Sequence, residues 1–354
     1  MRAGVAGLGS MGRRRVRDML ALGHQVFGYD VRPDRSAAAE REFGISTASS
    51  SDELLGGGAE GAIDALIIST PPDCHVEYYE RALRAGLPFF SEASILTPTS
   101  EWFEARAAGP LMLGCPSATM RFDPLVMLLR ERIAALGPDG MRSFHYAAGD
   151  YLPRWHPFEE YDEFYAGAGR ATSGARESVT FELDWICWML GPVATVNAIH
   201  RACGEWRTDI DDTYALLLEF ESGIVGTLTL ELHQLAPFKL TRLSHREQSL
   251  TLDLYGGTLI GHRLASDGGV TSEAIGPTGV DRQQVYLEEI RAFADAVAAG
   301  RPYFKSWQED RHLSDVLCAA ELSEQSGAWV RVEDVHDAYA GTDLSRVPPI
   351  YSTS

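Results

Sequence analysis

Cysteine, positive charge and long apolar runs are all scarce in this sequence. The five cysteines lie far apart, and no two have the spacing of a metal knuckle or a redox pair, so no metal site is expected. Isolated cysteines are typical of small apolar residues in a reducing compartment. No apolar run approaches the roughly 18 residues of a membrane span, and the N-terminus enters a strand and a glycine loop without the apolar core of a signal peptide. We therefore expect a cytoplasmic protein.

The charge balance is acidic, with 31 Lys and Arg residues against 50 Asp and Glu, which gives a net charge of -19. A protein with this charge repels phosphate backbones and anionic membrane surfaces over a Debye length. Neither nucleic acid nor a membrane is therefore expected as a partner. The length of 354 residues predicts about two domains, each large enough to bury a hydrophobic core.

Residues 1–118 alternate short apolar runs with helical stretches. This alternation is typical of βαβ units and a parallel sheet. Strands are expected at 3–6, 25–29, 65–69 and 87–90, with helices such as 12–22 and 75–85 between them.

Residues 119–354 have longer alternating runs. The runs 212–220 and 224–232 are joined through Glu221-Ser222-Gly223, which is hairpin chemistry, and a second hairpin is expected around Gly256-Gly257. We expect an α+β domain with an open, mostly antiparallel sheet for substrate binding. A sheet face without helices would expose apolar area, which predicts a homo-oligomer built on that face.

A glycine-rich loop joins the first expected strand to the first helix. Gly7, Gly9 and Gly12 have the G-x-G-x-x-G spacing. The first glycine permits a tight turn, the second lets the backbone approach a pyrophosphate, and the third allows close helix–strand packing. Roughly 20 residues later, Asp30 ends the second strand, where it can accept hydrogen bonds from an adenosine ribose. We therefore expect a Rossmann domain over 1–118 that binds NAD through this loop, which also contains Ser10 and Met11.

Arginines near this loop leave two points open. Arg13, Arg14 and Arg15 occupy the first helix turn, where the helix dipole disfavours positive charge unless an anion is bound. They either help to hold the pyrophosphate or form a solvated face. Arg32 and Arg35 follow the second strand and could accept a 2'-phosphate, so NADP is the less favoured alternative to NAD.

Short motifs spread over most of the chain are informative in combination. They are STPPDCH at 69–75, AGLP at 85–88, SE at 91–92, RFDP at 121–124, WMLG at 188–191 and DIDDT at 209–213. Together they resemble the glucose-fructose oxidoreductase/inositol dehydrogenase (Gfo/Idh/MocA) family. The resemblance implies the fold and the cofactor class, and it places Thr70, Pro71, Pro72, His75 and Glu92 at the cofactor.

The sequence departs from this family at two positions that handle protons. In the family a Glu-Lys-Pro motif ends the strand, and its lysine contacts nicotinamide and substrate; this chain has Glu92, Ala93 and Ser94 there. The family's substrate domain usually carries a helix with an aspartate and, four residues later, a histidine that serves as acid and base. Counting back from the WMLG motif, the corresponding residues are Glu177 and Phe181. Both usual proton-handling groups are absent.

The helix over about 175–190 mixes acids with aromatic rings on one face. Glu177, Phe181, Asp184 and Trp188 fall on one stripe at helical spacing, whereas a purely structural stripe would more often be uniformly apolar. We expect Glu177 to act as acid or base in a cleft, and Phe181 and Asp184 to bind substrate. The alternative for Glu177 is a helix-surface or N-terminal dipole role.

The aromatic loop 150–161 resembles a loop in a branch of the family associated with nucleotide-activated or acidic sugars. Its Arg154, His156 and Tyr161 could bind carboxylate, phosphate or hydroxyl groups. We expect Arg154 to bind substrate, and His156 and Tyr161 to replace the absent acid and base. The alternative is a rigid loop packed over the domain junction.

These observations favour an NAD(H)-dependent oxidoreductase that acts on a sugar-like, nucleotide-sugar or cyclitol substrate with a relocated acid/base set. Oxidising a hydroxyl requires a base for the O–H proton, and matched proton transfer is worth about 10²–10⁴-fold in rate. Two alternatives are open. One is a redox-neutral lyase or epimerase in which Glu177 and Glu182 abstract protons; the other is a non-catalytic pseudoenzyme that binds NAD(H) or a sugar.

Overall fold

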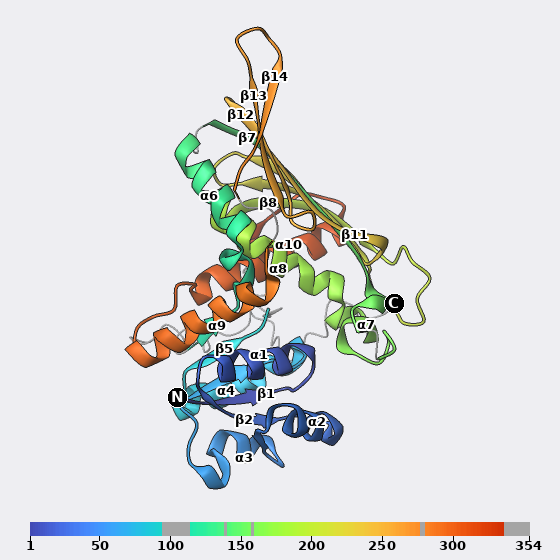
Figure 1. The fold of residues 1–354 in the computed structure, drawn as a ribbon. Coiled ribbons are helices and arrows are strands. Elements are labelled where there is room, and N and C mark those ends of the chain that lie inside the picture. Colours follow the sequence, from blue (N-terminus) through green and yellow to red (C-terminus); the bar gives the residue numbers. More distant parts are fainter. Residues whose placement is uncertain (94–113, 138–139, 157–158, 277–279, 336–354) are drawn as a thin grey trace. The chain divides into compact units, whose positions relative to one another are not determined.

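The computed structural model describes residues 1–93, 114–137, 140–156, 159–276 and 280–335, and Figure 1 gives the ribbon. The chain divides into two compact units. The first is Met1–Thr119 with Gln283–Arg311, and the second is Met120–Arg282 with His312–Ser354.

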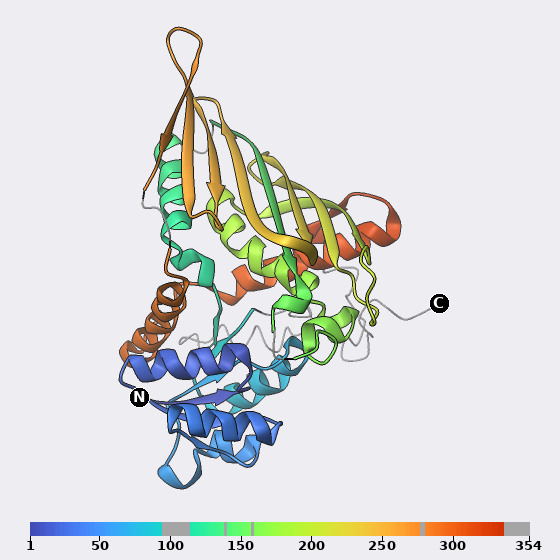
Figure 2. The ribbon, with the colours of Figure 1, turned by 45° about the vertical axis from the view of Figure 1, so that its right-hand side comes forward.

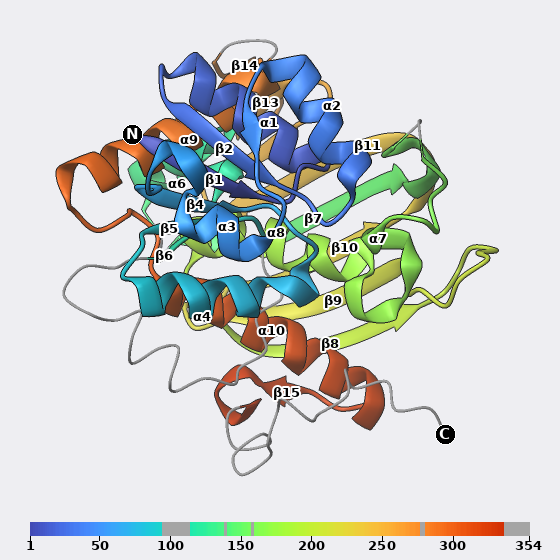
Figure 3. The ribbon, with the colours of Figure 1, turned by 90° about the horizontal axis from the view of Figure 1, so that it is seen from below.

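The first unit is built on a parallel sheet of six strands in the order β3-β2-β1-β4-β5-β6 (Figure 3). Strands β1, β4, β5 and β6 are buried along their whole length, as expected for a parallel sheet covered on both faces. The strands are β1 (Arg2–Ala6), β2 (Gln25–Tyr29), β3 (Ser46–Thr47), β4 (Ala65–Ile68), β5 (Phe89–Ser91) and β6 (Gly114–Pro116).

Helices cover both faces of this sheet. One core layer joins α1, α2 and α9 to the sheet through Val16, Ala39 and Phe293, and the other joins α3 and α4 to it through Leu54 and Tyr79. The helices are α1 (Ser10–Ala21), α2 (Pro33–Phe43), α3 (Ser51–Gly56), α4 (His75–Ala85) and α9 (Arg282–Ala299).

The chain returns to the first unit late in the sequence. The expected boundary between residues 118 and 119 places residues 283–311 in the second domain, whereas in the structure they pack with the first unit. The reason is α9, because Ile290 and Phe293 complete an apolar layer against the sheet and Glu289 pairs with Arg15 of α1.

The second unit contains a nine-stranded sheet in the order β14-β13-β12-β11-β7-β10-β9-β8-β15, in which β10 and β7 pair in parallel and the other neighbours antiparallel. Both expected hairpins are present, with Gly223 and Gly257 in their turns at φ 80° and 64°. The fold class is therefore the expected one. The strands are β7 (Met141–Tyr151), β8 (Val193–Arg201), β9 (Thr213–Phe220), β10 (Val225–Glu231), β11 (His233–His245), β12 (Gln248–Asp253), β13 (Thr258–Leu264), β14 (Val270–Ala274) and β15 (Val330–Arg331).

Helices of this unit lie along one face of its sheet (Figures 1 and 2). They are α6 (Pro124–Leu136), α7 (Tyr165–Ala168), α8 (Gly174–Leu190) and α10 (Trp307–Ser326), which enters this unit at His312. Strand β9 alternates buried with exposed residues, the pattern of a sheet covered on one side. Ile199, Leu217, Val225 and Leu240 are exposed on the other side.

Candidate functional site

The glycine loop between β1 and α1 has the backbone geometry of a pyrophosphate-binding turn. Gly7 has φ +86°, and a Cβ there would lie 2.4 Å from the Ser69 carbonyl oxygen. A Cβ at Gly12 would lie 1.8 Å from the Gly7 carbonyl oxygen, so both positions exclude a side chain. At Gly9 the atom nearest to a Cβ would be Arg35 Nη1 at 3.4 Å, so the backbone before α1 leaves room for a ligand.

Asp30 is anchored beside this loop, just after β2. Its Oδ2 accepts a hydrogen bond from the Leu8 amide at 2.7 Å, and its Oδ1 accepts one from the Arg32 amide at 2.8 Å. The Arg32 guanidinium itself is paired with Asp34. The carboxylate thus lies at the carboxyl edge of the sheet, which is the position that a ribose-binding acid requires.

The three arginines that follow the loop have protein partners. Arg13 pairs with Glu42, and the guanidinium carbon of Arg14 lies 4.0 Å from the centroid of the Tyr286 ring. Arg15 is fully buried and so does not belong to a solvated face.

The buried Arg15 holds the end of β5. Its guanidinium donates to the two carboxylate oxygens of Glu92 at 2.6 and 2.8 Å and to Glu289 at 2.9 Å. Burial opposes the charged form, yet the two carboxylates hold the pKa of Arg15 above its ordinary value. The Ser69 hydroxyl adds a hydrogen bond to Glu92 at 3.2 Å. Glu92, an expected cofactor residue, is therefore fixed next to the 69–75 turn.

His75, also expected at the cofactor, is buried behind the 69–75 turn. Its Nε2 donates to the Thr70 carbonyl at 2.8 Å, and its Nδ1 accepts from the Tyr79 hydroxyl at 3.2 Å. Burial lowers the pKa of His75, which keeps the imidazole neutral near neutral pH. Pro72 is buried and Pro71 exposed. The first unit thus brings the glycine loop, this turn and the end of β5 to one edge of its sheet.

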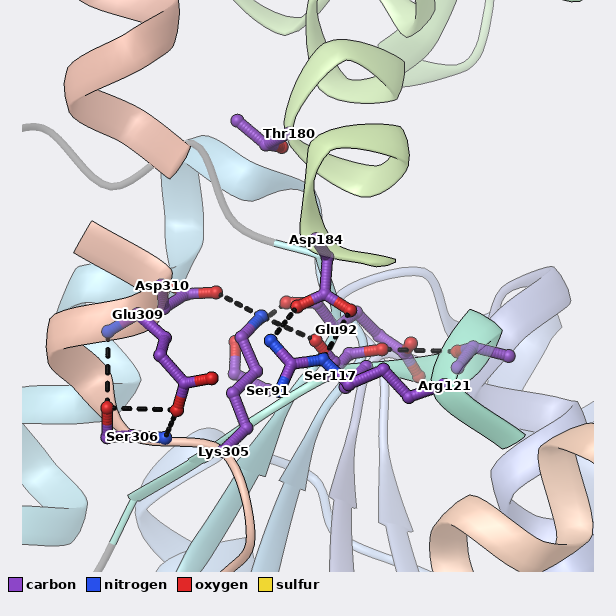
Figure 4. Close-up of polar contacts among 12 residues, drawn as sticks. Ser91, Glu92, Ser117, Arg121, Thr180, Asp184, Lys305, Ser306, Glu309 and Asp310 are labelled. Carbon is purple, nitrogen blue, oxygen red and sulfur yellow. Dashed lines mark hydrogen bonds and ion pairs between the residues drawn. The ribbon is translucent and has the colours of Figure 1, made fainter. Parts of the chain in front are cut away.

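Helix α8 places two of its expected acids in different surroundings. Glu177, in the first turn, accepts a hydrogen bond from the Tyr165 hydroxyl at 2.7 Å. Asp184 is buried and paired with Arg121, whose Nε and Nη2 lie 3.1 and 2.8 Å from its two oxygens (Figure 4). This bidentate pair fixes the RFDP segment against α8. The expected substrate residue Asp184 therefore has both carboxylate oxygens bound to protein.

Phe181, at the expected histidine position, lies beside a lysine that sequence reasoning missed. Lys239 Nζ on β11 lies 5.4 Å from the centroid of the Phe181 ring and 2.5 Å from Oε1 of Glu182. Glu182 is buried, and its Oε2 accepts from the Trp185 indole at 2.8 Å. The scarcity of lysine could have pointed to Lys239 in the sequence, because only two of the 31 Lys and Arg residues are lysines, Lys239 and Lys305.

Lys305 is a buried cation of the first unit. Its Nζ donates to the Ser117 carbonyl at 2.8 Å and to Asp310 at 2.7 Å (Figure 4). Because Ser117 follows β6, this lysine ties the segment before α10 to the carboxyl edge of the sheet.

In the loop 150–161, of which residues 157 and 158 lie outside the described parts, His156 is connected to the start of α8. Its ring stacks on Phe164 with centroids 4.4 Å apart, and its Nδ1 lies 3.5 Å from Glu159. Phe164 precedes Tyr165, which donates to Glu177. The structure therefore links two of the three expected acid/base residues through two aromatic side chains.

The other two candidates of this loop have different neighbours. The Tyr161 hydroxyl accepts from the Arg207 amide at 2.6 Å, and its ring packs edge-on against Trp206 with centroids 5.3 Å apart. Arg154 donates to the Leu235 carbonyl of β11 at 3.1 Å. Tyr161 therefore contacts the segment before β9, and Arg154 contacts β11.

Among the residues that the structure describes, no His, Cys, Asp and Glu side chains group as metal ligands. Over the same residues, no helix is both long and apolar enough to cross a membrane. The five cysteines are free thiols.

Several known proteins with similar sequences or folds carry names of dehydrogenases. UDP-N-acetylglucosamine 3-dehydrogenase of Acidithiobacillus ferrooxidans is 25% identical over 317 residues, which cover 86% of this chain and 91% of that protein. Inositol 2-dehydrogenase 2 of Saccharopolyspora erythraea is 27% identical over 237 residues, or 64% of this chain and 65% of that protein. Levoglucosan dehydrogenase in complex with NADH and levoglucosan has the same fold, with a TM-score of 0.78 and 17% identity over 94% of this chain and 99% of that one.

Two family matches cover most of the chain. Residues 1–108 match the oxidoreductase family with an NAD-binding Rossmann fold, and residues 141–250 match the GFO/IDH/MocA C-terminal domain. The expected NAD cofactor and the expected fold are confirmed. The chain belongs to the Gfo/Idh/MocA oxidoreductase family.

Proposed function

We propose that the chain is an NAD(H)-dependent oxidoreductase that acts on a hydroxyl or carbonyl carbon of a sugar-like, nucleotide-sugar or cyclitol substrate. The observation that carries the proposal is the presence, in one chain, of a glycine-loop cofactor unit and the family's open-sheet domain. Two relatives whose names specify UDP-N-acetylglucosamine and inositol support the substrate class. NAD, when bound, supplies the two-electron acceptor, or the donor when reduced.

The first unit has the groups that this cofactor needs. Gly7, Gly9 and Gly12 let the backbone and the N-terminus of α1 approach the pyrophosphate, and Asp30 accepts hydrogen bonds from the adenosine ribose. The further proposed cofactor contacts are Ser10, Met11, Thr70, Pro71, Pro72, His75 and Glu92.

The substrate domain, in this proposal, works with a relocated acid/base set, because Ala93 and Phe181 have no proton to transfer. The hydrogen bond that Glu177 accepts and the aromatic stack on His156 support a shared site at the start of α8. The proposed proton-handling residues are His156, Tyr161 and Glu177, and the proposed substrate contacts are Arg154, Phe181 and Asp184.

The test is a panel of UDP-sugars, inositols and anhydrosugars with NAD⁺, in which NADH formation is followed by absorbance. Single replacements His156→Asn, Tyr161→Phe and Glu177→Gln should lower turnover by about 10²-fold or more in at least one case. NADH affinity should stay nearly unchanged, because the first unit holds the cofactor. Full turnover in all three variants would show that the relocated set is wrong.

The same panel separates two alternatives. Turnover without net NADH formation would favour a redox-neutral lyase or epimerase. NADH binding with no turnover of any member would favour a pseudoenzyme, for which the joint loss of lysine at 93 and histidine at 181 is the supporting observation.

We also propose that the face of the second sheet opposite α6, α8 and α10 mediates homo-oligomerisation. Ile199, Leu217, Val225 and Leu240 are exposed there, and an apolar patch of this kind often marks an interface. Light scattering at micromolar concentration should give at least a dimer, and Leu217→Glu should weaken this dimer; a wild-type monomer would contradict the proposal.

The free cysteines support a proposed cytoplasmic location, which cell fractionation tests.

A further inference from the structure

Lysine is almost absent from this protein, since only two of its 31 basic residues are lysines. Arginine stays charged at every physiological pH, whereas lysine can release its proton when its surroundings favour the neutral amine. A lysine can therefore take part in proton transfer where its surroundings allow it, which an arginine cannot do. Lys305 is buried among acceptors of the first unit, whereas Lys239 in the second unit keeps 22% of its side chain exposed.

Lys239 is held between β11 and α8. Its Nζ lies 2.5 Å from Oε1 of Glu182, a residue that is 2% exposed and fixed through its other oxygen by Trp185. The same Nζ lies over the ring of Phe181 at 5.4 Å from the centroid. A buried carboxylate and an aromatic face both favour the charged form of a lysine, and 22% of the Lys239 side chain is exposed.

Further titratable groups surround this ammonium. The Tyr255 hydroxyl donates to Asp150 at 3.3 Å, and burial, followed by Asp150, raises the pKa of Tyr255. Burial, together with Glu182, raises the pKa of Tyr146 well above its ordinary value. Both phenols therefore keep their protons at neutral pH. Charged and titratable groups near Lys239 include Glu182 on α8, Asp123 before α6 and Tyr255 after β12. Asp150 and Arg282 interact in turn with Tyr255, and Tyr146 interacts with Glu182.

We propose that Lys239 donates a proton to the substrate oxygen and that Glu182 positions its ammonium. The proposal rests on the oxidoreductase function above and takes the direction of carbonyl reduction. It gives the proton transfer at the substrate oxygen to Lys239 in place of His156, Tyr161 and Glu177. In that step the carbonyl carbon gains one hydrogen and two electrons from NADH, and the C=O double bond becomes a C–O single bond. The oxygen takes the proton from Nζ. The products are an alcohol, NAD⁺ and a neutral lysine, which solvent water protonates again.

Two substitutions separate proton donation from fixed charge. Lys239→Arg keeps a positive charge and hydrogen-bond donors but gives up no proton, whereas Lys239→Met removes both. With a ketone substrate and NADH, we expect Lys239→Arg to hold KM within about 3-fold while kcat falls by about 10²–10⁴-fold. Lys239→Met should lower kcat and raise KM. Arg246→Met, which replaces an exposed cation just beyond β11, is the control and should leave both constants unchanged.

A second readout does not depend on turnover. Because the chain has two lysines, ¹³C labelling at lysine Cε gives two side-chain signals in an NMR spectrum, and Lys239→Met assigns them. In the NADH complex Lys239 should be an ammonium at about pH 7, and Glu182→Gln should lower its pKa, because the substitution removes the neighbouring negative charge.

The outcomes distinguish this inference from the function on which it rests. Full kcat in Lys239→Arg, or a Lys239 signal that titrates below about pH 7, would overturn the proton-donor role. If the wild-type protein reduces no carbonyl compound of the panel and forms no NADH with the alcohols, the oxidoreductase proposal fails, and the role of Lys239 fails with it.

Discussion

Glu289→Gln should destabilise the first unit strongly, because four hydrogen-bond donors surround this carboxylate. Glu289 is fully buried. Its Oε1 accepts from the Ser117 hydroxyl at 2.9 Å and the Ala118 amide at 2.7 Å. Its Oε2 accepts from the Thr119 hydroxyl at 2.8 Å and from Arg15 at 2.9 Å.

Glutamine has nearly the same shape but replaces one acceptor oxygen with an NH₂ group. In one orientation this group faces the Ala118 N–H, and in the other it faces the Arg15 guanidinium. Neither partner can become an acceptor, so either orientation leaves a buried donor unsatisfied, at about 1–3 kcal/mol. The substitution also removes a charge beside a buried arginine, and breaking a buried ion pair costs about 3–5 kcal/mol. Since Arg15 keeps Glu92 as a partner, only part of the ion-pair cost applies, and we expect a total loss of about 3 kcal/mol in the free energy of unfolding.

The assay is urea unfolding combined with hydrogen exchange of β1 peptides, which reports on the first unit in a chain with two compact units. Glu288→Gln is the matched control, because the neighbouring carboxylate is 40% exposed and contacts Arg291 on the surface. Its effect should stay within about 0.5 kcal/mol. If Glu289→Gln lowers the free energy of unfolding of the first unit by less than about 1 kcal/mol, the four donors around this carboxylate do not require its charge.

Other predictions concern the cofactor loop and pH. Asp30→Ala should narrow the preference for NADH over NADPH in binding titrations. Equal affinities of the wild-type protein for the two cofactors would show that Arg32 or Arg35, and not Asp30, determines the choice. Gly12→Ala should abolish NADH binding, since its Cβ would lie 1.8 Å from a carbonyl oxygen, whereas Gly56→Ala, with nothing within 4 Å, should bind normally. Burial raises the pKa of Asp18 to about 6, so the stability that its protonated form contributes is lost as pH rises from about 4 through 6. The urea midpoint of Asp18→Asn should therefore rise relative to that of the wild type as the pH increases over that range. Midpoints that depend on pH in the same way in both proteins would contradict this prediction. Ala93→Lys with Phe181→His should not simply raise turnover, because the substrate would meet a new charge and lose an aromatic surface; a strong gain in turnover would indicate a decayed form of the family's site.

Local constraints made the cofactor loop predictable from sequence. Gly7 and Gly12 are required because a Cβ at either would strike a backbone carbonyl, and their spacing alone carries that information. The assignment of residues 283–311 to the first unit depends instead on the hydrogen bond between Arg15 and Glu289, which lie 274 residues apart in the sequence. An amphipathic helix such as α9 gives no indication in the sequence of which domain it will cover.

The substrate domain was less predictable for the same reason. The pairing of Lys239 with Glu182 depends on the register of β11 and on how α8 lies against the sheet, and neither follows from periodicity. The same holds in the first unit, where the helix position of Arg15 predicts a ligand of the pyrophosphate or a solvated residue. Its full burial instead depends on Glu92 and Glu289, which lie far away in the sequence.

The central claim is that this protein transfers hydrogen between NAD and a sugar-like substrate although residues 93 and 181 are alanine and phenylalanine. The most direct test uses NADH with deuterium at the reactive nicotinamide carbon, the keto forms of the sugar and cyclitol panel, and mass spectrometry of the products. We predict an alcohol that carries one deuterium, formed by the wild-type protein and by Arg246→Met but nearly absent with Lys239→Arg. Tight NADH binding with no deuterated product from any member of the panel would contradict the claim.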